Sequence, residues 1–256
     1  MFKRAILRVP GKNFADGLTT VDLGVPKFEL VLEQHAHYCE ALRECGLDLT
    51  ILQPDLRHAD STFVEDTAIL TPHAAILCRP GAPSREGEVA AIRPAIERFY
   101  DRILTIEAPG TVDGGDICEA GEHFFIGLSQ RTNQEGAHQL SAHLKTLGYT
   151  ASIIDIRPMK TILHLKSGIS YIGRDTLVVM EEMAASRRFA HFNLLRVGDS
   201  ESYAANCVRV NDRVLLAQGF PHLRDQLTAR GFNPLVLDMS EFQKMDGGLS
   251  CLSLRF

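Results

Sequence analysis

A thiol, an imidazole and several carboxylates stand at the ends of strand-like segments, where side chains often gather into a site. Cys251 follows the run DGGLS, His164 begins the run HLKSG, and Asp113 begins the run DGGD. Two acids, Glu65 and Asp66, lie together in the run FVED. A cysteine thiolate is a strong nucleophile, and a histidine held by a carboxylate can transfer protons near neutral pH. These residue types therefore predict covalent catalysis, provided that the fold brings them together.

Each of these residues also has an ordinary structural interpretation. A single cysteine in an apolar segment is most often a buried and unreactive side chain. His164 stands between leucines, which is typical of a core histidine, and Gly-Gly beside an aspartate is typical of a turn. The acidic residues of the loop 60–66 could simply be solvated. The arrangement of the surrounding elements has to decide between the two interpretations.

The composition limits the classes of protein that fit. The chain has 256 residues, 45% of them hydrophobic and 23% charged, which is ordinary for a globular protein. Its net charge of -5 and the lack of any basic block argue against a nucleic acid partner. No apolar run approaches the ~20 residues that a membrane span needs, and the N-terminal segment turns polar too early for a signal peptide.

The cysteines and histidines predict neither a disulfide framework nor a metal centre. The six cysteines form no C-x-x-C pair, so we expect free thiols and a cytoplasmic protein. His35 and His37 lie in a helical pattern that points their rings to different sides, so no structural metal is expected.

Helical and strand-like patterns alternate along the chain, and each helix is followed by a strand. Helical patterns cover residues 27–45, 86–100, 131–147, 185–192 and 221–230. A unit of strands, a helix and another strand thus recurs every ~40–50 residues, which is typical of radial repetition. The first unit lacks one strand, and the final run SCLSLRF is one strand in excess.

Pairing of SCLSLRF with the first run, RAILRV, would close a ring. The sequence therefore predicts a five-unit α/β propeller with pseudo-fivefold symmetry, formed by residues 1–256 as a single catalytic domain. An open doubly wound sheet is the alternative. In the ring, the residues that follow the last strand of each unit would converge on the axis. Cys251, His164 and the carboxylates would then share one pocket.

Seven runs, in order between about residue 3 and residue 256, closely resemble the dimethylarginine dimethylaminohydrolases. They are FVEDTAIL, RPGAPSREGE, GTVDGGDI, FFIGLSQRTNQEG, LHLKSG, SYAANC and KMDGGLSC. That family belongs to the guanidine-modifying (pentein) superfamily, whose fold is a five-unit α/β propeller. The resemblance implies hydrolysis of Nω,Nω-dimethyl-L-arginine and Nω-monomethyl-L-arginine to L-citrulline plus dimethylamine or methylamine, through a covalent thiouronium intermediate and without a cofactor or metal.

The resemblance also implies the residue roles. Cys251 is the expected nucleophile, His164 the general acid and base, and Asp113 the carboxylate that orients His164, where some relatives have glutamate. The expected substrate-binding residues are Glu65 and Asp66 at the guanidinium, Asp60 at the amino-acid end, Arg85 and Arg131 at the α-carboxylate, Leu18 in a lid hinged at Gly17, and the backbone carbonyl of Met245. No role is implied for Asn206.

Three alternatives share this fold. Arginine deiminase acts on free arginine, but that family is longer, places an aspartate where this chain has Lys166, and commonly has an arginine where this chain has Glu65. Agmatine deiminases act on a substrate without the carboxylate that two arginines would bind. A non-catalytic binding protein would not need Cys251, His164 and Asp113 together. The oligomeric state stays open, and a homodimer is one option.

Overall fold

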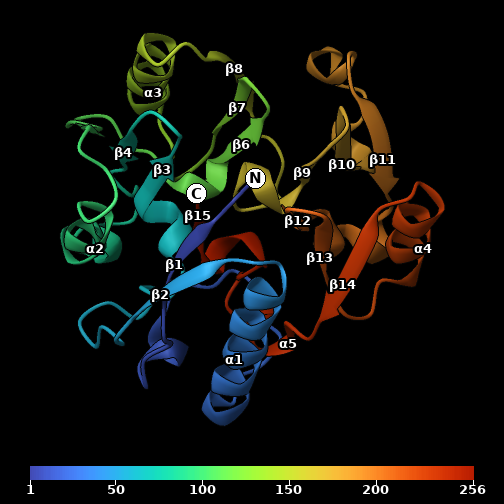
Figure 1. The fold of residues 1–256 in the computed structure, drawn as a ribbon, viewed down its shortest axis with the longest axis horizontal. Coiled ribbons are helices and arrows are strands. Elements are labelled where there is room, and N and C mark those ends of the chain that lie inside the picture. Colours follow the sequence, from blue (N-terminus) through green and yellow to red (C-terminus); the bar gives the residue numbers. More distant parts are fainter.

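The computed structural model describes residues 1–256, and its strands form five small sheets arranged in a ring (Figure 1). Each sheet has three strands, in the orders β15-β1-β2, β3-β4-β5, β6-β7-β8, β11-β10-β9 and β12-β13-β14. The bounds of the strands are β1 Arg4–Arg8, β2 Asp48–Leu52, β3 Ala68–Leu70, β4 Ala75–Leu77, β5 Ile103–Thr105, β6 Ile117–Ala120, β7 His123–Leu128, β8 Thr150–Asp155, β9 Ile169–Gly173, β10 Thr176–Met180, β11 Asn193–Val197, β12 Val208–Val210, β13 Arg213–Ala217, β14 Asn233–Leu237 and β15 Leu254–Arg255. The predicted five-unit α/β propeller is confirmed.

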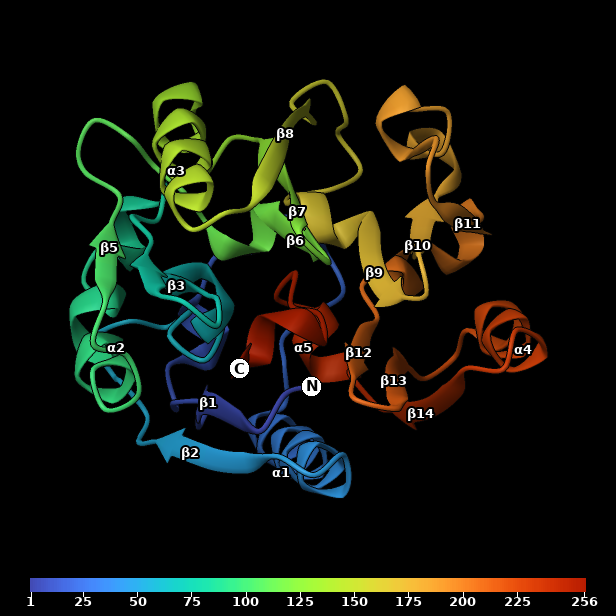
Figure 2. The same cartoon turned by 45° about the horizontal axis from the view of Figure 1, so that its top comes forward.

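Every unit follows one connection rule. An antiparallel pair is followed by a crossover segment and a third strand that runs parallel to the middle one, as β6, β7 and β8 illustrate. A parallel neighbour needs such a crossover because a tight turn can only reverse the chain. Four of the five crossovers contain an α-helix on the outer rim of the ring (Figure 2). These helices are α1 Phe28–Glu44, α2 Glu88–Ile96, α3 Gln134–Thr146 and α4 Pro221–Ala229.

Helix α1 illustrates how a stripe of apolar residues packs a crossover helix against the ring. Its buried residues Val31, Tyr38 and Leu42 recur at helical spacing and pack into the largest apolar cluster of the protein. The helix stops before Gly46, whose φ of 86° is a conformation that glycine adopts without strain.

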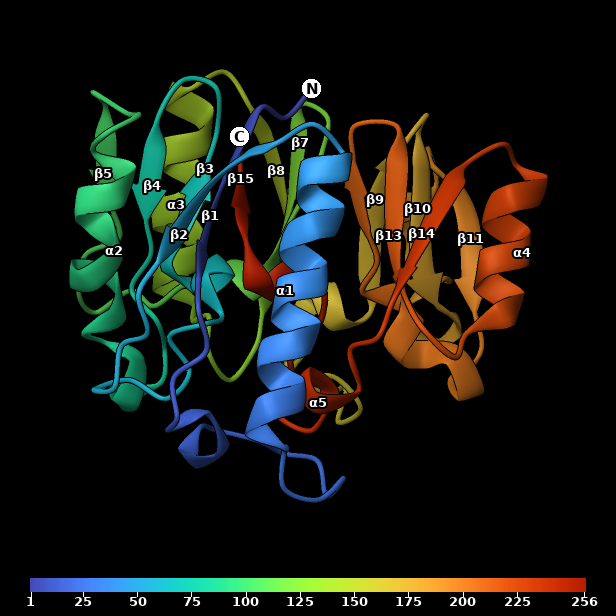
Figure 3. The same cartoon turned by 60° about the horizontal axis from the view of Figure 1, so that its bottom comes forward.

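The ring closes as the excess strand suggested. Ala5 pairs with Arg255 and Ile6 with Leu254, in antiparallel register. The carbonyl of Phe256 also accepts hydrogen bonds from the N–H groups of Lys3 and Arg4, both at 2.8 Å. Figure 3 shows β15 beside β1, with the loop 11–25 and the short helix α5 (Ser240–Gln243) at the opposite end of the ring from the two termini.

The structure differs from the sequence prediction in two segments. Residues 185–192 form no α-helix, because this crossover contains only the 3₁₀ turns Glu181–Met183 and Arg187–Phe189, the second capped by the Ser186 side chain. The final run is not one strand, since Ser250–Leu252 form a 3₁₀ turn before β15. None of the helices has the length and apolar character needed to cross a membrane.

Candidate active site

Side chains from several units of the ring line a cavity of about 200 Å³. Cys251, His164 and Glu65 line it, together with Lys166 and Asn206. A second cavity, of about 500 Å³, shares Glu65 and Lys166 with the first. The smaller cavity therefore contains the thiol and the imidazole that the sequence singled out.

Cys251 lies at the middle of the 3₁₀ turn, where its Sγ accepts a hydrogen bond from the N–H of Gly248 at 3.4 Å. It is the only one of the six cysteines that is not buried. Although the residue is partly exposed, loss of hydration around its sulfur, followed by the charges of Glu65 and Asp66, raises the pKa of its thiol to about 12. The thiol is therefore neutral at neutral pH in the free protein.

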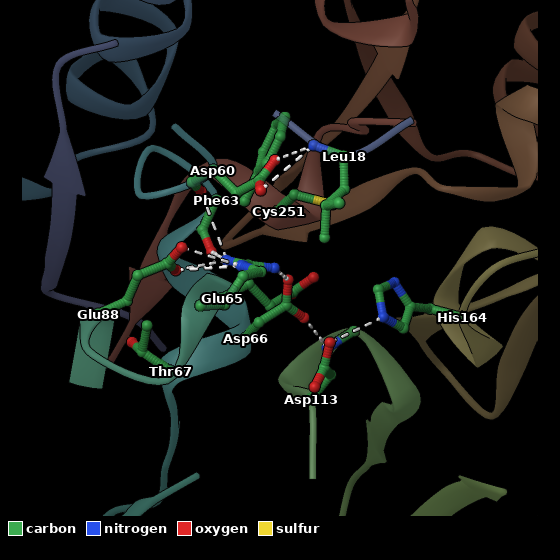
Figure 4. A network of polar contacts seen from close by, with 12 residues as sticks. Leu18, Asp60, Phe63, Glu65, Asp66, Thr67, Glu88, Asp113, His164 and Cys251 are labelled. Carbon is green, nitrogen blue, oxygen red and sulfur yellow. Dashed lines mark hydrogen bonds and ion pairs between the residues drawn. The ribbon is translucent and has the colours of Figure 1, made fainter. Parts of the chain in front are cut away.

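His164 precedes the 3₁₀ turn Leu165–Ser167, and its Nε2 lies 3.2 Å from Oδ2 of Asp113 (Figure 4). Burial lowers the pKa of His164, but the carboxylates of Asp116, Asp66 and Asp113 outweigh burial and raise it to about 9. The imidazole is therefore protonated at neutral pH and can donate a proton.

Asp113 is buried, and its other oxygen, Oδ1, accepts a hydrogen bond from the N–H of Gly81 at 2.7 Å. The two residues that follow Asp113 are glycines because neighbouring groups lie too close to their backbone to leave room for a side chain. A Cβ at Gly114 would lie 2.0 Å from the carbonyl oxygen of Glu65, and a Cβ at Gly115 would lie 3.0 Å from the His164 ring. The run DGGD therefore lets the backbone approach both the acidic loop and the imidazole.

The acidic pair Glu65 and Asp66 is held by hydrogen bonds on both carboxylates. Asp66 accepts from the N–H of Gly115 at 2.7 Å and from Nη1 of Arg85 at 2.5 Å. Burial would raise the pKa of Asp66, but Arg85 and His164 lower it. Glu65 accepts from the Ser250 hydroxyl at 2.7 Å and forms an ion pair with the ammonium group of Lys166.

The structure places Arg85 among carboxylates. Besides its bond to Asp66, its guanidinium donates to Glu88 at 2.7 Å and to the carbonyl of Phe63 at 3.0 Å. Its pKa is raised well above the usual value, because these carboxylates outweigh the effect of burial. Glu88 had no role in the sequence analysis, although its spacing of three residues from Arg85 on a helical pattern was a usable signal.

The other predicted residues lie around the cavity. Asp60 is buried and accepts from the N–H of Leu18 at 3.0 and 3.3 Å (Figure 4). Burial raises the pKa of Asp60, while Arg85 and Arg131 act in the opposite direction. Met245 is buried in the apolar cluster around α1. Leu18, Asp60, Asp66, Arg85, Asp113, Arg131 and Met245 do not themselves line the cavity wall.

The loop after Leu18 contributes to the cavity wall. Val21 and Leu23 line the cavity, and Thr20 is bound to Asp246 through its N–H at 2.5 Å and its hydroxyl at 3.1 Å. Gly17 adopts an ordinary negative φ, and a Cβ there would lie 2.5 Å from Asp60. Close approach to Asp60 therefore explains this glycine.

Asn206, which had no role in the sequence analysis, joins the Cys251 turn to the His164 turn. Its amide donates to the carbonyl of Lys166 and to the hydroxyl of Ser250, both at 3.0 Å, and accepts from the N–H of Ser250 at 3.0 Å. A Cβ at Gly248 would lie 2.5 Å from Oδ1 of Asn206, so this glycine allows the turn to approach.

Ligand atoms of Asp66, Asp113 and His164 lie within 4.8 Å of one another, a spacing at which three such groups can hold a metal ion. Here Arg85 and the N–H of Gly115 bond to the two oxygens of Asp66, and the two oxygens of Asp113 are bonded to the N–H of Gly81 and to His164. The arrangement is therefore suited to proton transfer.

Comparison with known proteins agrees with this geometry. Residues 58–218 match the family model for arginine deiminase. Together with the five-unit ring and the Cys–His–Asp arrangement, this match defines a protein of the arginine deiminase class. The chain is 44% identical to the N(G),N(G)-dimethylarginine dimethylaminohydrolase of Pseudomonas aeruginosa, over 100% of both chains. It belongs to the dimethylarginine dimethylaminohydrolase family.

Two solved structures extend the similarity to three dimensions. A cysteine-to-serine mutant of the Pseudomonas aeruginosa enzyme complexed with citrulline superposes with a TM-score of 0.97, at 44% identity and 100% coverage of both chains. A histidine-to-glycine mutant of a dimethylarginine dimethylaminohydrolase, an adduct with S-methyl-L-thiocitrulline, gives the same TM-score, identity and coverage.

Proposed function

We propose that this protein hydrolyses Nω,Nω-dimethyl-L-arginine and Nω-monomethyl-L-arginine to L-citrulline plus dimethylamine or methylamine. The observation that carries the proposal is the placement of Cys251 and His164 in one cavity, with Asp113 bonded to the imidazole. The citrulline complex and the thiocitrulline adduct of related proteins support the same chemistry. The reaction is an attack on a carbon–nitrogen bond of a guanidinium group.

In the first step the Cys251 thiol releases its proton to solvent as the cationic guanidinium binds, and the resulting thiolate adds to the central guanidinium carbon with formation of a carbon–sulfur bond. A guanidinium carbon is a poor electrophile because its charge is spread over three nitrogens. The protonated His164 gives its proton to the departing methylated nitrogen, and the carbon–nitrogen bond breaks. The amine leaves, and a thiouronium group remains attached to Cys251.

In the second step water adds to the thiouronium carbon while the neutral His164 accepts a proton from it. The carbon–sulfur bond then breaks, sulfur takes the second proton of the water and leaves as the thiol, and the carbonyl of citrulline forms. Asp113 keeps the imidazole in place through both steps, because it accepts from Nε2 of the protonated ring. The enzyme returns to its starting state after one water is consumed.

We assign the substrate contacts as follows. Glu65 and Asp66 face the guanidinium, Asp60 and the backbone of Leu18 hold the amino-acid end, the carbonyl of Met245 adds a hydrogen bond, and Arg131 and Arg85 bind the α-carboxylate. Arg85 would have to give up part of its contact with Asp66 and Glu88 to do so, and Arg131 is therefore the first choice for the clamp.

Selectivity against plain arginine follows from the pairing of Glu65. One oxygen of this carboxylate is taken by Lys166 and the other by Ser250, so fewer acceptors remain for guanidinium N–H groups. N-methyl groups replace N–H donors and do not need those acceptors. The site therefore favours methylated substrates over free arginine.

Citrulline formation from dimethylarginine, monomethylarginine and arginine tests the proposal, with the Cys251→Ser variant alongside. We expect turnover of both methylated substrates, weak action on arginine, and loss of activity in the variant. Faster turnover of arginine would assign the protein to the deiminases, and no turnover of any guanidine would leave it a binding protein.

We further propose a cytoplasmic enzyme whose residues 1–256 act as one catalytic domain. The free state of all six cysteines supports a reducing compartment. We propose a homodimer as its assembly, which light scattering after size-exclusion chromatography would test; a monomer mass across a concentration series would contradict it.

A further inference from the structure

Asp116, the last residue of the run DGGD, is fully buried beside the site and has no part in the reaction described above. Its Oδ1 accepts a hydrogen bond from the N–H of Leu165 at 3.0 Å, and its Oδ2 accepts one from the hydroxyl of Ser129 at 2.6 Å. One carboxylate therefore joins the turn that carries His164 to the loop that carries Arg131.

The loop 129–132 extends this connection to Asp113. The hydroxyl of Ser129 accepts from the N–H groups of Arg131 at 2.9 Å and Thr132 at 3.0 Å. The hydroxyl of Thr132, in the same loop, accepts a hydrogen bond from the N–H of Asp113 at 3.1 Å. Three segments of the site, from two units of the ring, thus meet at one buried carboxylate.

We propose that Asp116 is a positioning residue, which fixes His164, Asp113 and Arg131 relative to one another and whose negative charge helps to keep His164 protonated. This inference rests on the proposed function, because it assigns Asp116 to the same site. A carboxylate without water around it is costly to bury unless its lone pairs are used, and here both oxygens are bonded.

The electrostatic part follows from the groups around the imidazole. Among the carboxylates that raise the pKa of His164, Asp116 has the largest effect, followed by Asp66 and Asp113. Asp66 already forms an ion pair with Arg85, which partly neutralises its charge. The other titratable groups that line the cavity are Glu65, Lys166, Tyr203, Asp246 and Cys251. Burial raises the pKa of Asp116 itself to about 6, so its carboxylate is charged above that pH.

The test uses two variants, one that removes the negative charge of Asp116 and one that removes its hydrogen bond with Ser129. Asp116→Asn keeps the size of the side chain and removes its charge. We expect the pKa of His164 to fall by about half a unit or more, and kcat/KM to fall by about 10- to 100-fold with its alkaline limb moved to lower pH. Ser129→Ala leaves the charge and loosens the Arg131 loop, so we expect a higher KM and an unmoved alkaline limb.

The matched control is Asp155→Asn, which removes an exposed carboxylate at the end of β8 that pairs with Arg157. We expect its kinetics and its His164 pKa to equal those of the wild type. A folded Asp116→Asn enzyme with unchanged His164 pKa and unchanged kcat/KM would overturn the inference.

Two further measurements keep the inference testable. If Asp116→Asn does not fold, Thr132→Val removes the hydroxyl link to Asp113 and Thr132→Ser retains it. A Val variant as active as the Ser variant and the wild type would then refute the positioning role.

The His164 pKa is read by NMR from the imidazole signal that disappears in His164→Asn, so it needs no turnover. A wild type without activity on methylarginine would refute the proposed function, while a His164 shift in Asp116→Asn would still support the inference.

Discussion

At the scale of single residues, the protonation states of Cys251 and His164 define the starting point of the proposed reaction. The imidazole, with a pKa of about 9, holds a proton at neutral pH, and the thiol, with a pKa of about 12, keeps its own. A neutral thiol is a weak nucleophile. Because Glu65 and Asp66 raise the thiol pKa, a positive guanidinium beside them would lower it again.

We therefore expect a non-reactive guanidinium ligand to lower the pKa of Cys251. Thiolate absorbance, titrated with and without the ligand, measures this directly, and the Cys251→Ser variant provides the baseline for the other cysteines. The effect is expected to be at least about one pH unit, since one close charge commonly shifts a pKa by 1–3 units. Identical titration curves would contradict it.

The residue types of the site could be predicted from the sequence, but their partners could not. Cys251 and His164 are recognisable from the runs around them, and they line one cavity. The engagement of Arg85 with Asp66 depends on tertiary contact, since these residues belong to different local segments. Likewise, nothing in the run DGGD showed that Asp116 would accept a bond from Leu165, 49 residues further along the chain.

At the scale of elements, glycine pairs allow the 3₁₀ turns to approach one another. Gly114 and Gly115 lie against the Glu65 backbone and the His164 ring, while Gly248 lies against Asn206. No strain in φ requires a glycine at these three positions. The need is for space, because a methyl group at each would occupy the position of a neighbouring group.

Gly115→Ala is expected to reduce kcat with little loss of stability. The new Cβ would stand 3.0 Å from the His164 ring and from Oδ1 of Asp66, so both must move by a few tenths of an ångström. Small misplacements of catalytic groups cost about tenfold or more in rate. Gly198→Ala is the matched control, since no atom lies within 4 Å of a Cβ there. Wild-type kcat in Gly115→Ala would show that the imidazole tolerates the displacement.

The elements themselves were predicted best where their pattern is long. Helix α1 matches its prediction to within a residue at each end, because its apolar stripe repeats over several turns. Residues 185–192 were predicted wrongly as a helix, because so short a pattern does not outweigh local capping by Ser186 and burial of Phe189. The start of α3 at Gln134 is set by Asn133, whose side chain accepts from the N–H of Gly136.

At the scale of the whole molecule, closure of the ring fixes the segment that carries Cys251, the proposed nucleophile. The hydroxyl of Tyr38, on α1, donates to the carbonyl of Leu249 at 2.8 Å and lies 2.7 Å from the hydroxyl of Ser253. Leu249 and Ser253 lie two residues before and two residues after Cys251, so these contacts hold its turn at both ends. The excess strand made the ring predictable from the sequence, whereas this link between a rim helix and the axial segment needed the structure.

Tyr38→Phe is expected to lower the free energy of unfolding by about 1–3 kcal/mol, the usual cost of leaving a buried polar group without its partner. Urea unfolding measures the change, and a lower kcat in the folded variant would show that the Cys251 turn has loosened. Tyr100→Phe is the control, since the Tyr100 hydroxyl has no hydrogen-bond partner among the protein's side chains or backbone. If the two variants had the same free energy of unfolding, the Tyr38 hydrogen bonds would make no measurable contribution to stability.

The shared position of Glu65 and Lys166 between the two cavities has a kinetic consequence. Their ion pair lies in the lining that the two cavities share, so we expect substrate and amine to use the smaller cavity, which contains Cys251, rather than the larger one. The amine departs while the rest of the substrate is still bound to sulfur, and it competes with water for the same intermediate. Isotopically labelled dimethylamine added during turnover should therefore be incorporated into unreacted dimethylarginine, and the rate of that exchange measures how often the first step reverses.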